Sequence, residues 1–281
     1  MKKTEPTHIK HKRLLVINDH GIFGGGTENR IRTLIIKFLE TSFFEEIHVL
    51  QRFSSDTEKL STLPESIKER LFIHTLHDES CFFRIMQLIQ KYSIDVVQCH
   101  NLTAISPLVI LAARIKKRPV IFYAHDYWPL CGYRSFIHPH SFKESQLCQT
   151  NHSFGQAHCL SLKAQVKYFF WKKILNLCTI GIATGKNMVD IYETNAVLRK
   201  RWNITTPWIN PLFFEQKKNK SIRTKTKQRV IPHTILFVGS LLPFKGAFVA
   251  VQALKYIVKK FPHAQLLLAG SEQEYNSPCR Q

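Results

Sequence analysis

Side chains able to form hydrogen bonds or exchange a proton directly follow four apolar runs of the sequence. The residues in these positions are Asn18, His100 with Asn101, His125 with Asp126, and Thr184. In an open parallel sheet, ligands bind beyond the carboxyl ends of the strands. A single histidine after a strand is usually structural, but several polar residues that reach one sheet edge predict a binding cleft.

Three consecutive glycines, Gly24 to Gly26, lie between the first apolar run and the helix expected after it. Glycine lets backbone amides approach a ligand closely, and the N-terminus of a helix favours anionic groups. The spacing differs from the GxGxxG of dinucleotide-binding loops. A tight turn that binds nothing is therefore the alternative to a ligand-binding loop.

The elements that must position these residues alternate along the chain. Strands are predicted at the apolar runs 13–18, 47–50, 71–73, 94–99, 119–124 and 179–184, and a last one at 202–209. Helices are predicted between them at 27–40, 82–92, 104–116 and 163–177. Strands that are apolar on both faces indicate a parallel sheet covered on both sides. The sequence therefore predicts an α/β fold, with a first domain over residues 1–209.

The rest of the chain predicts a linker and a second domain. Residues 210–233 are basic and poor in apolar side chains, which is typical of a linker. A new apolar run at 234–238 begins the second domain, 234–281. A strand–helix–strand unit of this size buries little surface and is marginal without a partner. We expect an incomplete domain, and a complementary chain is one way to complete it.

Charge and hydropathy limit the classes of function. The chain has 40 Lys and Arg against 20 Asp and Glu, a formal net charge of +20. Such a protein is attracted to polyanions, although a solvated surface is the simpler interpretation. No nucleic-acid-binding motif accompanies the charge, so nucleic acid is not an expected partner. With neither a membrane-spanning stretch nor a signal-peptide core, the sequence predicts a cytoplasmic protein.

Residues 163–177, KAQVKYFFWKKILNL, predict a basic helix that is rich in aromatic side chains. One apolar stripe would consist of Val166, Phe169, Phe170, Ile174 and Leu177, flanked by lysines. This composition suits a helix lying on anionic lipid at the inner face of the plasma membrane. Packing of the same stripe against the sheet is the alternative.

The chain has seven cysteines and no export signal, so reduced thiols are expected. Cys131, Cys148 and Cys159 lie in an irregular segment together with several histidines and could assemble a zinc site. Their spacing lacks the Cys-x-x-Cys pair of structural zinc sites. Isolated thiols and a disulfide remain the alternatives, and no metal is expected.

Four segments in order resemble the glycosyltransferases of family 4, the group 1 enzymes of the GT-B fold. The segments are GIFGGGTENR, DVVQCHNL, PVIFYAHDYWPLC and FVGSLLPFKG. The resemblance covers nearly the whole chain. It implies two Rossmann-like domains, the first binding mainly the acceptor and the second mainly the nucleotide-sugar donor, with the second domain truncated here.

The resemblance also implies roles for residues of the first domain. Gly24 and Gly25, with Gly26 beside them, match the loop that borders the diphosphate and sugar of the donor. His125 matches the histidine that faces the reacting sugar, and Asp126 matches its usual neighbour. Asn18, His100, Asn101 and Thr184 are expected on the acceptor side of the cleft.

In the second domain, Lys245 and Gly246 match the Lys-Gly pair that grips the donor phosphates. A lysine ammonium and helix-start amides can stabilise the charge that the leaving nucleoside diphosphate gains, without a metal. Two departures from the family pattern stand out. Ser240 replaces the usual arginine, which leaves Lys245 as the charged group at the phosphates. The paired-glutamate motif that holds the donor is expected beyond Gln281.

Two functions are therefore expected as alternatives for this chain. The resemblance implies transfer of a sugar from a nucleotide diphosphate sugar to a glycan or lipid-linked acceptor, with retained anomeric configuration and without a cofactor, in cell-surface polysaccharide biosynthesis. The alternative is an inactive remnant, or an acceptor-binding half that needs a separate donor-binding chain, because a fold does not establish activity.

Overall fold

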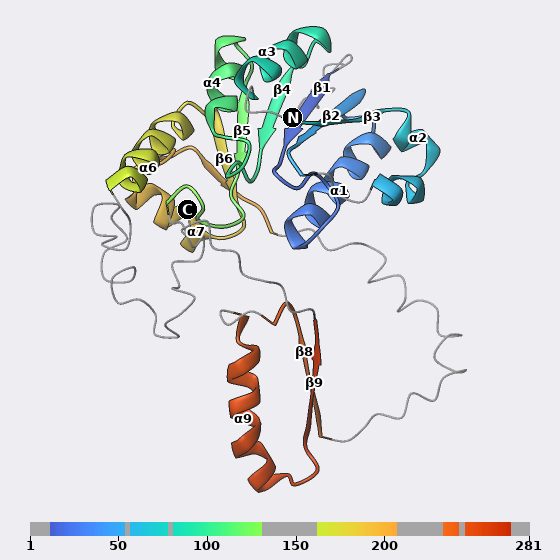
Figure 1. Cartoon of the computed structure of the whole chain (residues 1–281), viewed down its shortest axis with the longest axis vertical. Coiled ribbons are helices and arrows are strands. Elements are labelled where there is room, and N and C mark those ends of the chain that lie inside the picture. Colours follow the sequence, from blue (N-terminus) through green and yellow to red (C-terminus); the bar gives the residue numbers. More distant parts are fainter. Residues whose placement is uncertain are drawn as a thin grey trace, which may run out of the picture. The chain divides into compact units, whose positions relative to one another are not determined.

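The computed structural model describes residues 12–53, 57–77, 81–130, 162–206, 233–241 and 245–270. These residues belong to two compact units, one with strands β1 to β7 and the other with strands β8 and β9 (Figure 1). The predicted linker, 210–233, lies outside the described residues except for His233.

The first unit contains a seven-stranded parallel sheet with the strand order β3-β2-β1-β4-β5-β6-β7. Its strands are β1 (Arg13–Ile17), β2 (Glu46–Gln51), β3 (Leu71–Thr75), β4 (Val96–Cys99), β5 (Val120–Tyr123), β6 (Ile180–Ala183) and β7 (Trp202–Ile204). The chain runs outward from β1 to β3 and then crosses back to β4 on the other side of β1. The direction of winding therefore reverses between β1 and β4, and such a switch point opens a crevice at the carboxyl ends of the strands.

Helices cover the two faces of this sheet (Figure 1). In chain order they are α1 (Gly26–Glu40), the 3-10 helix η1 (Thr57–Thr62), α2 (Glu65–Lys68), α3 (Cys81–Lys91), α4 (Leu108–Ile115), α6 (Leu162–Leu175) and α7 (Lys186–Thr194). Right-handed crossovers place α3 and α4 on the face opposite to α1 and α2.

A buried core lies between α1 and one face of the sheet. Ile31, Ile35 and Leu39 recur every four residues along α1, so they share one side of the helix. They pack in one cluster with the alternate residues Leu14 and Val16 of β1. The predicted helix at 27–40 is confirmed, and this packing fixes α1 directly after the glycine loop.

The second unit contains β8 (Thr234–Val238), α9 (Ala247–Lys260) and β9 (Gln265–Ala269), and its two strands are parallel. The strand ends approach closely, because a Cβ added at Gly270 would lie 1.8 Å from the Gly239 carbonyl oxygen. Several apolar side chains are exposed, including Leu236 and Val238 of β8 and Val249 of α9. An α/β unit normally buries such residues against further elements.

Helix α6 does not pack its predicted apolar stripe against the sheet. Val166, Phe169 and Phe170 are about half exposed or more, whereas Tyr168 and Leu175 are buried. The hypothesis that the stripe packs against the sheet is therefore wrong. The segment is apolar on two sides, so helical spacing alone does not select the buried one. No helix in the described ranges combines the length and the apolar character needed to cross a membrane.

Candidate functional site

Two histidines meet beyond the carboxyl ends of the neighbouring strands β4 and β5. His100 directly follows β4, and its Nδ1 lies 2.7 Å from Nε2 of His125. The two rings are stacked with centroids 5.0 Å apart, and the ring of Tyr123 stacks on both. The Tyr123 hydroxyl in turn lies 3.1 Å from Oγ1 of Thr205, which follows β7. These contacts hold the His125 imidazole at the edge of the sheet.

Both imidazoles of this pair are neutral near pH 7. Burial, together with a smaller effect of the nearby charge of Arg30, lowers the pKa of His125 to about 3. Burial, together with His125, also places the pKa of His100 well below its usual value. One imidazole N–H therefore donates to the lone pair of the other ring.

Each imidazole ring has a second nitrogen atom that takes no part in the contact between the two histidines. Among the described residues, neither His125 Nδ1 nor His100 Nε2 has a hydrogen-bond partner, and both atoms are buried. Buried polar atoms nearly always have a partner, so an open one beside a sheet edge points to a ligand. The Asn101 side-chain oxygen is a third buried atom of this kind.

The neutral histidines make the stability of the first unit depend on pH. An unfolded histidine titrates near about 6.5. Between that pH and the folded-state pKa, the unfolded chain binds more protons, so the free energy of unfolding falls as pH falls. We expect this loss between pH 6.5 and 5, at up to about 1.4 kcal/mol per pH unit for each buried histidine.

Urea unfolding at pH 5, 6 and 7 measures this slope, in a range where carboxylates stay ionised. The variant His100→Gln/His125→Gln should show a shallower slope than the parent chain. The exposed His77→Gln should keep the parent slope. Equal slopes for all three chains would contradict the assignment.

Asn18 connects the glycine loop to the end of β4. Its buried Nδ2 donates to the Gly21 carbonyl oxygen (2.8 Å) and to Oε1 of Glu28 (3.2 Å), and its Oδ1 accepts from the Asn101 amide (3.3 Å). A Cβ at Gly24 would lie 3.1 Å from Glu28 Cγ. The loop is therefore packed around a buried carboxylate, which explains part of its glycine content without a ligand.

Gly25 is the N-cap of α1, and no side chain in the described part of the chain caps this helix start. The first amides of a helix lack partners within it, and the helix dipole makes this end positive. A Cβ at Gly26 would meet nothing within 4 Å. The helix start thus adds positive potential to the edge of the sheet near Asn18.

Asp126 and Thr184, the other predicted residues of this unit, have different surroundings. Asp126 Oδ1 accepts a hydrogen bond from the Trp128 amide (2.9 Å), and the Asp126 carbonyl oxygen accepts one from the Tyr192 hydroxyl (2.7 Å). These contacts fix the turn after His125. Thr184 follows β6 and directly precedes Gly185, the N-cap of α7. The structure therefore brings Asn18, His100, Asn101 and His125 to the ends of β1, β4 and β5, with Thr184 one strand further.

Lys245 and Gly246 lie in the second unit, at the start of α9. Lys245 is exposed. Gly246 caps α9 in the left-handed region, with φ of 85°, where glycine is favoured over other residues. The conformation gives Gly246 a structural reason of its own, and the phosphate role of Lys245 stays a prediction.

The predicted zinc ligands Cys131, Cys148 and Cys159 lie outside the described residues. The described cysteines, Cys81, Cys99 and Cys178, are buried and form no disulfide with one another. No group of three or more metal-binding side chains occurs in the part of the chain that the structure describes.

Sequence reasoning missed several residues that shape the site. Glu28 and Arg30 lie in the segment GIFGGGTENR, but nothing local shows that the first is buried against Asn18 or that the second acts on His125. Tyr123 and Thr205 contribute through the stacking and the hydroxyl contact described above. For Tyr123, its position at the end of the apolar run of β5 was the available signal.

A parallel sheet with a switch point between β1 and β4 and polar strand ends is typical of Rossmann-like α/β proteins. Within this class, the family model Glycosyltransferase Family 4 matches residues 24–210. The match spans the glycine loop, both histidines and all strands from β2 to β7. The chain therefore belongs to glycosyltransferase family 4.

Similar solved structures include a glycosyltransferase from Rickettsia africae ESF-5, with a TM-score of 0.57 and 16% identity, covering 93% of this chain and 61% of that one. Two others are the lipopolysaccharide outer core galactosyltransferase WaaB in its apo form (TM-score 0.48, 11% identity, 93% and 68% covered) and the UDP-GlcNAc 2-epimerase from Neisseria meningitidis bound to UDP-GlcNAc (0.48, 13%, 94% and 67%).

At such identities the likeness shows the fold alone. It confirms the predicted Rossmann-like α/β fold of the GT-B type. The chain spans about 61% of the length of the Rickettsia africae glycosyltransferase. No curated protein matches the sequence.

Proposed function

We propose that the chain transfers a sugar from a nucleoside diphosphate sugar to a glycan or lipid-linked acceptor. The observation that carries the proposal is the neutral His100–His125 pair, whose open His125 Nδ1 lies at the sheet edge in a member of glycosyltransferase family 4. A neutral imidazole can donate to or accept from a sugar hydroxyl. A protonated one would repel the cationic sugar that forms as the donor bond breaks.

The roles of the other residues follow from their chemistry. Gly24, Gly25 and Gly26 would border the diphosphate, where the open start of α1 favours anionic groups. Lys245 and Gly246 would bind the donor phosphates and stabilise the departing diphosphate, so that neither a metal nor another cofactor is needed. Asn18, Asn101 and Thr184 would bind the acceptor. We infer retention of anomeric configuration and a place in cell-surface polysaccharide assembly in the cytoplasm from the family resemblance.

The test is calorimetric binding of a panel of UDP-, GDP- and dTDP-sugars to the full chain, followed by detection of released nucleoside diphosphate. Binding of one donor at micromolar concentration, with turnover when an acceptor glycan is added, supports the transferase. Absence of binding across the panel contradicts it. Loss of donor binding in Lys245→Gln, just before α9, but not in Lys255→Gln within α9, would support the phosphate role.

The second candidate is an acceptor-binding half that works with a separate donor-binding chain. The exposed apolar side chains of β8 and α9 favour it, since Leu236 is 62% exposed and Val238 is 73% exposed. A donor-binding chain would bury this surface. Donor binding that appears only after a second polypeptide is added would favour this alternative over the complete enzyme.

We further propose that α6 contacts an anionic membrane. Its exposed Val166, Phe169 and Phe170 are accompanied by Lys167 and Lys173, whose ammonium groups lie over the rings of Trp171 and Phe169. Apolar side chains beside lysines suit the boundary between headgroups and acyl chains. Co-sedimentation with phosphatidylglycerol vesicles should fall in Phe169→Ser/Phe170→Ser, and binding that ignores lipid charge would contradict the electrostatic part.

A further inference from the structure

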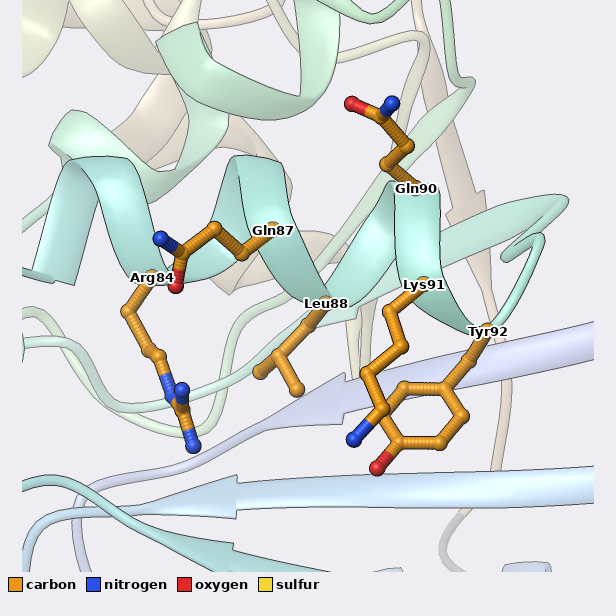
Figure 2. Close-up of a pocket in the computed structure, with 6 residues that line it drawn as sticks. All are labelled: Arg84, Gln87, Leu88, Gln90, Lys91 and Tyr92. Atoms are coloured by element: carbon orange, nitrogen blue, oxygen red, sulfur yellow. The ribbon is translucent and has the colours of Figure 1, made fainter.

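A pocket opens beside α3, on the face of the sheet away from α1. It has a volume of about 430 Å³ and is lined by Arg84, Gln87, Leu88, Gln90, Lys91 and Tyr92. Ligand sites in proteins occupy about 300–1,000 Å³, so the pocket is large enough for a sugar ring with its substituents. Arg84, Leu88, Lys91 and Tyr92 point to the same side of the helix, toward the strands (Figure 2).

The topology of the sheet explains why this face is open. After β3 the chain crosses back over the sheet to β4, and α3 packs against α4. On this face, the edge strand β3 and its neighbour β2 lie next to the end of α3, where Tyr92 contacts rings of both strands. On this face, the two strands carry imidazole and aromatic rings instead of aliphatic side chains. Phe72 of β3 is 38% exposed.

The rings form one cluster next to the pocket. His48 of β2 stacks on Phe72, and its Nδ1 lies 3.1 Å from Nε2 of His74. The ring of Tyr92, which lines the pocket, lies 4.4 Å from the ring of His48 and 5.3 Å from that of His74. Burial is the main cause that lowers the pKa of His74 to about 4, and burial also lowers the pKa of His48 against the opposing effect of Glu46.

The charge of the lining is positive. Arg84 and Lys91 stand seven residues apart on α3, hence on one side of the helix. Neither forms an ion pair with a carboxylate within the described ranges, and Lys91 Nζ lies 4.9 Å above the Tyr92 ring. On the other side of α3, Gln90 Oε1 accepts a hydrogen bond from Nζ of Lys116, the residue that follows α4 (3.1 Å) (Figure 2).

We propose that this pocket binds an acidic sugar residue of a glycan, with Arg84 and Lys91 at its carboxylate or phosphate group and Gln87 at its hydroxyls. Two cations on one side of a helix favour a group with several anionic oxygens, and an arginine guanidinium can hold such a group with two parallel hydrogen bonds. Amide side chains match the paired donors and acceptors of sugar hydroxyls. The anion follows from the lining, and the sugar as its carrier rests on the proposed function.

The pocket lies over β2 and β3, whereas the histidine pair lies at the ends of β4 and β5. An acidic glycan held here would be anchored at a point separate from the reacting sugar. Such a remote contact would raise the effective concentration of the acceptor glycan at the reacting site. The acceptor of the proposed transferase would then be a glycan that contains acidic sugars.

The test is calorimetric titration of the full chain with trigalacturonate, without any donor, at low and at moderate salt. We expect the variant Arg84→Gln/Lys91→Gln to bind at least tenfold more weakly than the parent chain. Arg199→Gln/Lys200→Gln removes the same formal charge from the loop before β7 and should bind like the parent. Both pairs are exposed, and melting curves will show that the folds are intact.

Further titrations distinguish the possible carriers of the anionic group, which are a sugar, free phosphate and a lipid headgroup. Neutral galactotriose should not bind, and inorganic phosphate should compete only weakly with trigalacturonate. Unchanged binding in the α3 variant, or equal weakening in both variants, would overturn the proposal. Phosphate that binds as tightly as trigalacturonate would refute the sugar as carrier. Loss of vesicle binding in the α3 variant without any trisaccharide binding would assign the pocket to a lipid headgroup instead.

The same titrations distinguish the two proposals. Trigalacturonate binding that depends on Arg84 and Lys91, in a chain that binds no nucleotide sugar, would contradict the transferase and leave the glycan site standing. Transfer activity that is equal in the parent chain and the α3 variant, with no trisaccharide binding, would remove only the glycan site.

Discussion

Replacement of His125 with alanine is expected to lower the rate of sugar transfer at least 100-fold, with little change in donor affinity. Positioned groups of this type typically contribute about 10²- to 10⁴-fold to a rate. The geometry favours His125 because its Nε2 is fixed by His100 at 2.7 Å while its Nδ1 has no partner in the described part of the chain. Steady-state kinetics with the best donor of the panel would measure kcat and KM separately.

Two variants control this experiment. His77→Ala removes an exposed histidine beyond β3 and should leave kcat unchanged. His100→Asn removes a positioning residue, so it should lower kcat less than the His125 change does and should alter the pH profile of kcat, since the tautomer of His125 is no longer fixed. A His125→Ala chain that folds normally and retains more than half of the parent kcat would contradict the assignment.

The architecture was predictable because its signal is local and repeated. Each strand of a parallel sheet with helices on both faces is a continuous apolar run, so β1, β4 and β5 are visible in the sequence without any knowledge of their neighbours. The boundaries were less accurate. The helix expected at 104–116 begins at Leu108, because residues 103–105 form a turn that is held from a distant strand end.

The strand ends of the candidate site were also predictable, since the carboxyl end of a parallel strand is fixed by where its apolar run stops. The residues that these strand ends contact were not predictable. Asp19 and residues 103–105 are more than eighty positions apart, and they meet only because β1 and β4 are neighbours at the switch point. Glu28 is a helix-start carboxylate that propensity places on the surface, yet the loop around Gly24 buries it.

The exposed stripe of α6 shows a different limit. Its sequence has aromatic residues on every side of the helix, so periodicity leaves two candidate faces. The choice depends on which partners exist. The ring centroid of Trp128, from the segment after β5, lies 5.2 Å from that of Trp171, and the Trp171 ring in turn packs on the ring of Tyr168. The interaction therefore selects the side with Tyr168 and turns Phe169 and Phe170 outward.

The second large effect is expected at Asp19, in stability rather than in activity. Its buried carboxylate accepts hydrogen bonds from the Thr103 amide (2.8 Å), the Thr103 hydroxyl (2.6 Å), the Ala104 amide (3.1 Å) and the Ile105 amide (3.0 Å). Asp19→Ala leaves these donors without their acceptor. Hydrogen bonds to a charged group contribute about 1.5–3 kcal/mol each, and some donors will recover water. We expect the free energy of unfolding to fall by about 3 kcal/mol.

Urea unfolding followed by tryptophan fluorescence would measure this loss as a lower midpoint at an unchanged slope. Asp190→Ala removes a carboxylate whose partner is the exposed Lys186, so it should cost less than about 1 kcal/mol. Asp19→Asn keeps one acceptor oxygen but turns an amide group toward backbone donors. Its loss of unfolding free energy should therefore lie between those of Asp190→Ala and Asp19→Ala. A loss below about 1 kcal/mol in Asp19→Ala would contradict the view that this carboxylate joins the ends of β1 and β4, on which the position of His100 depends.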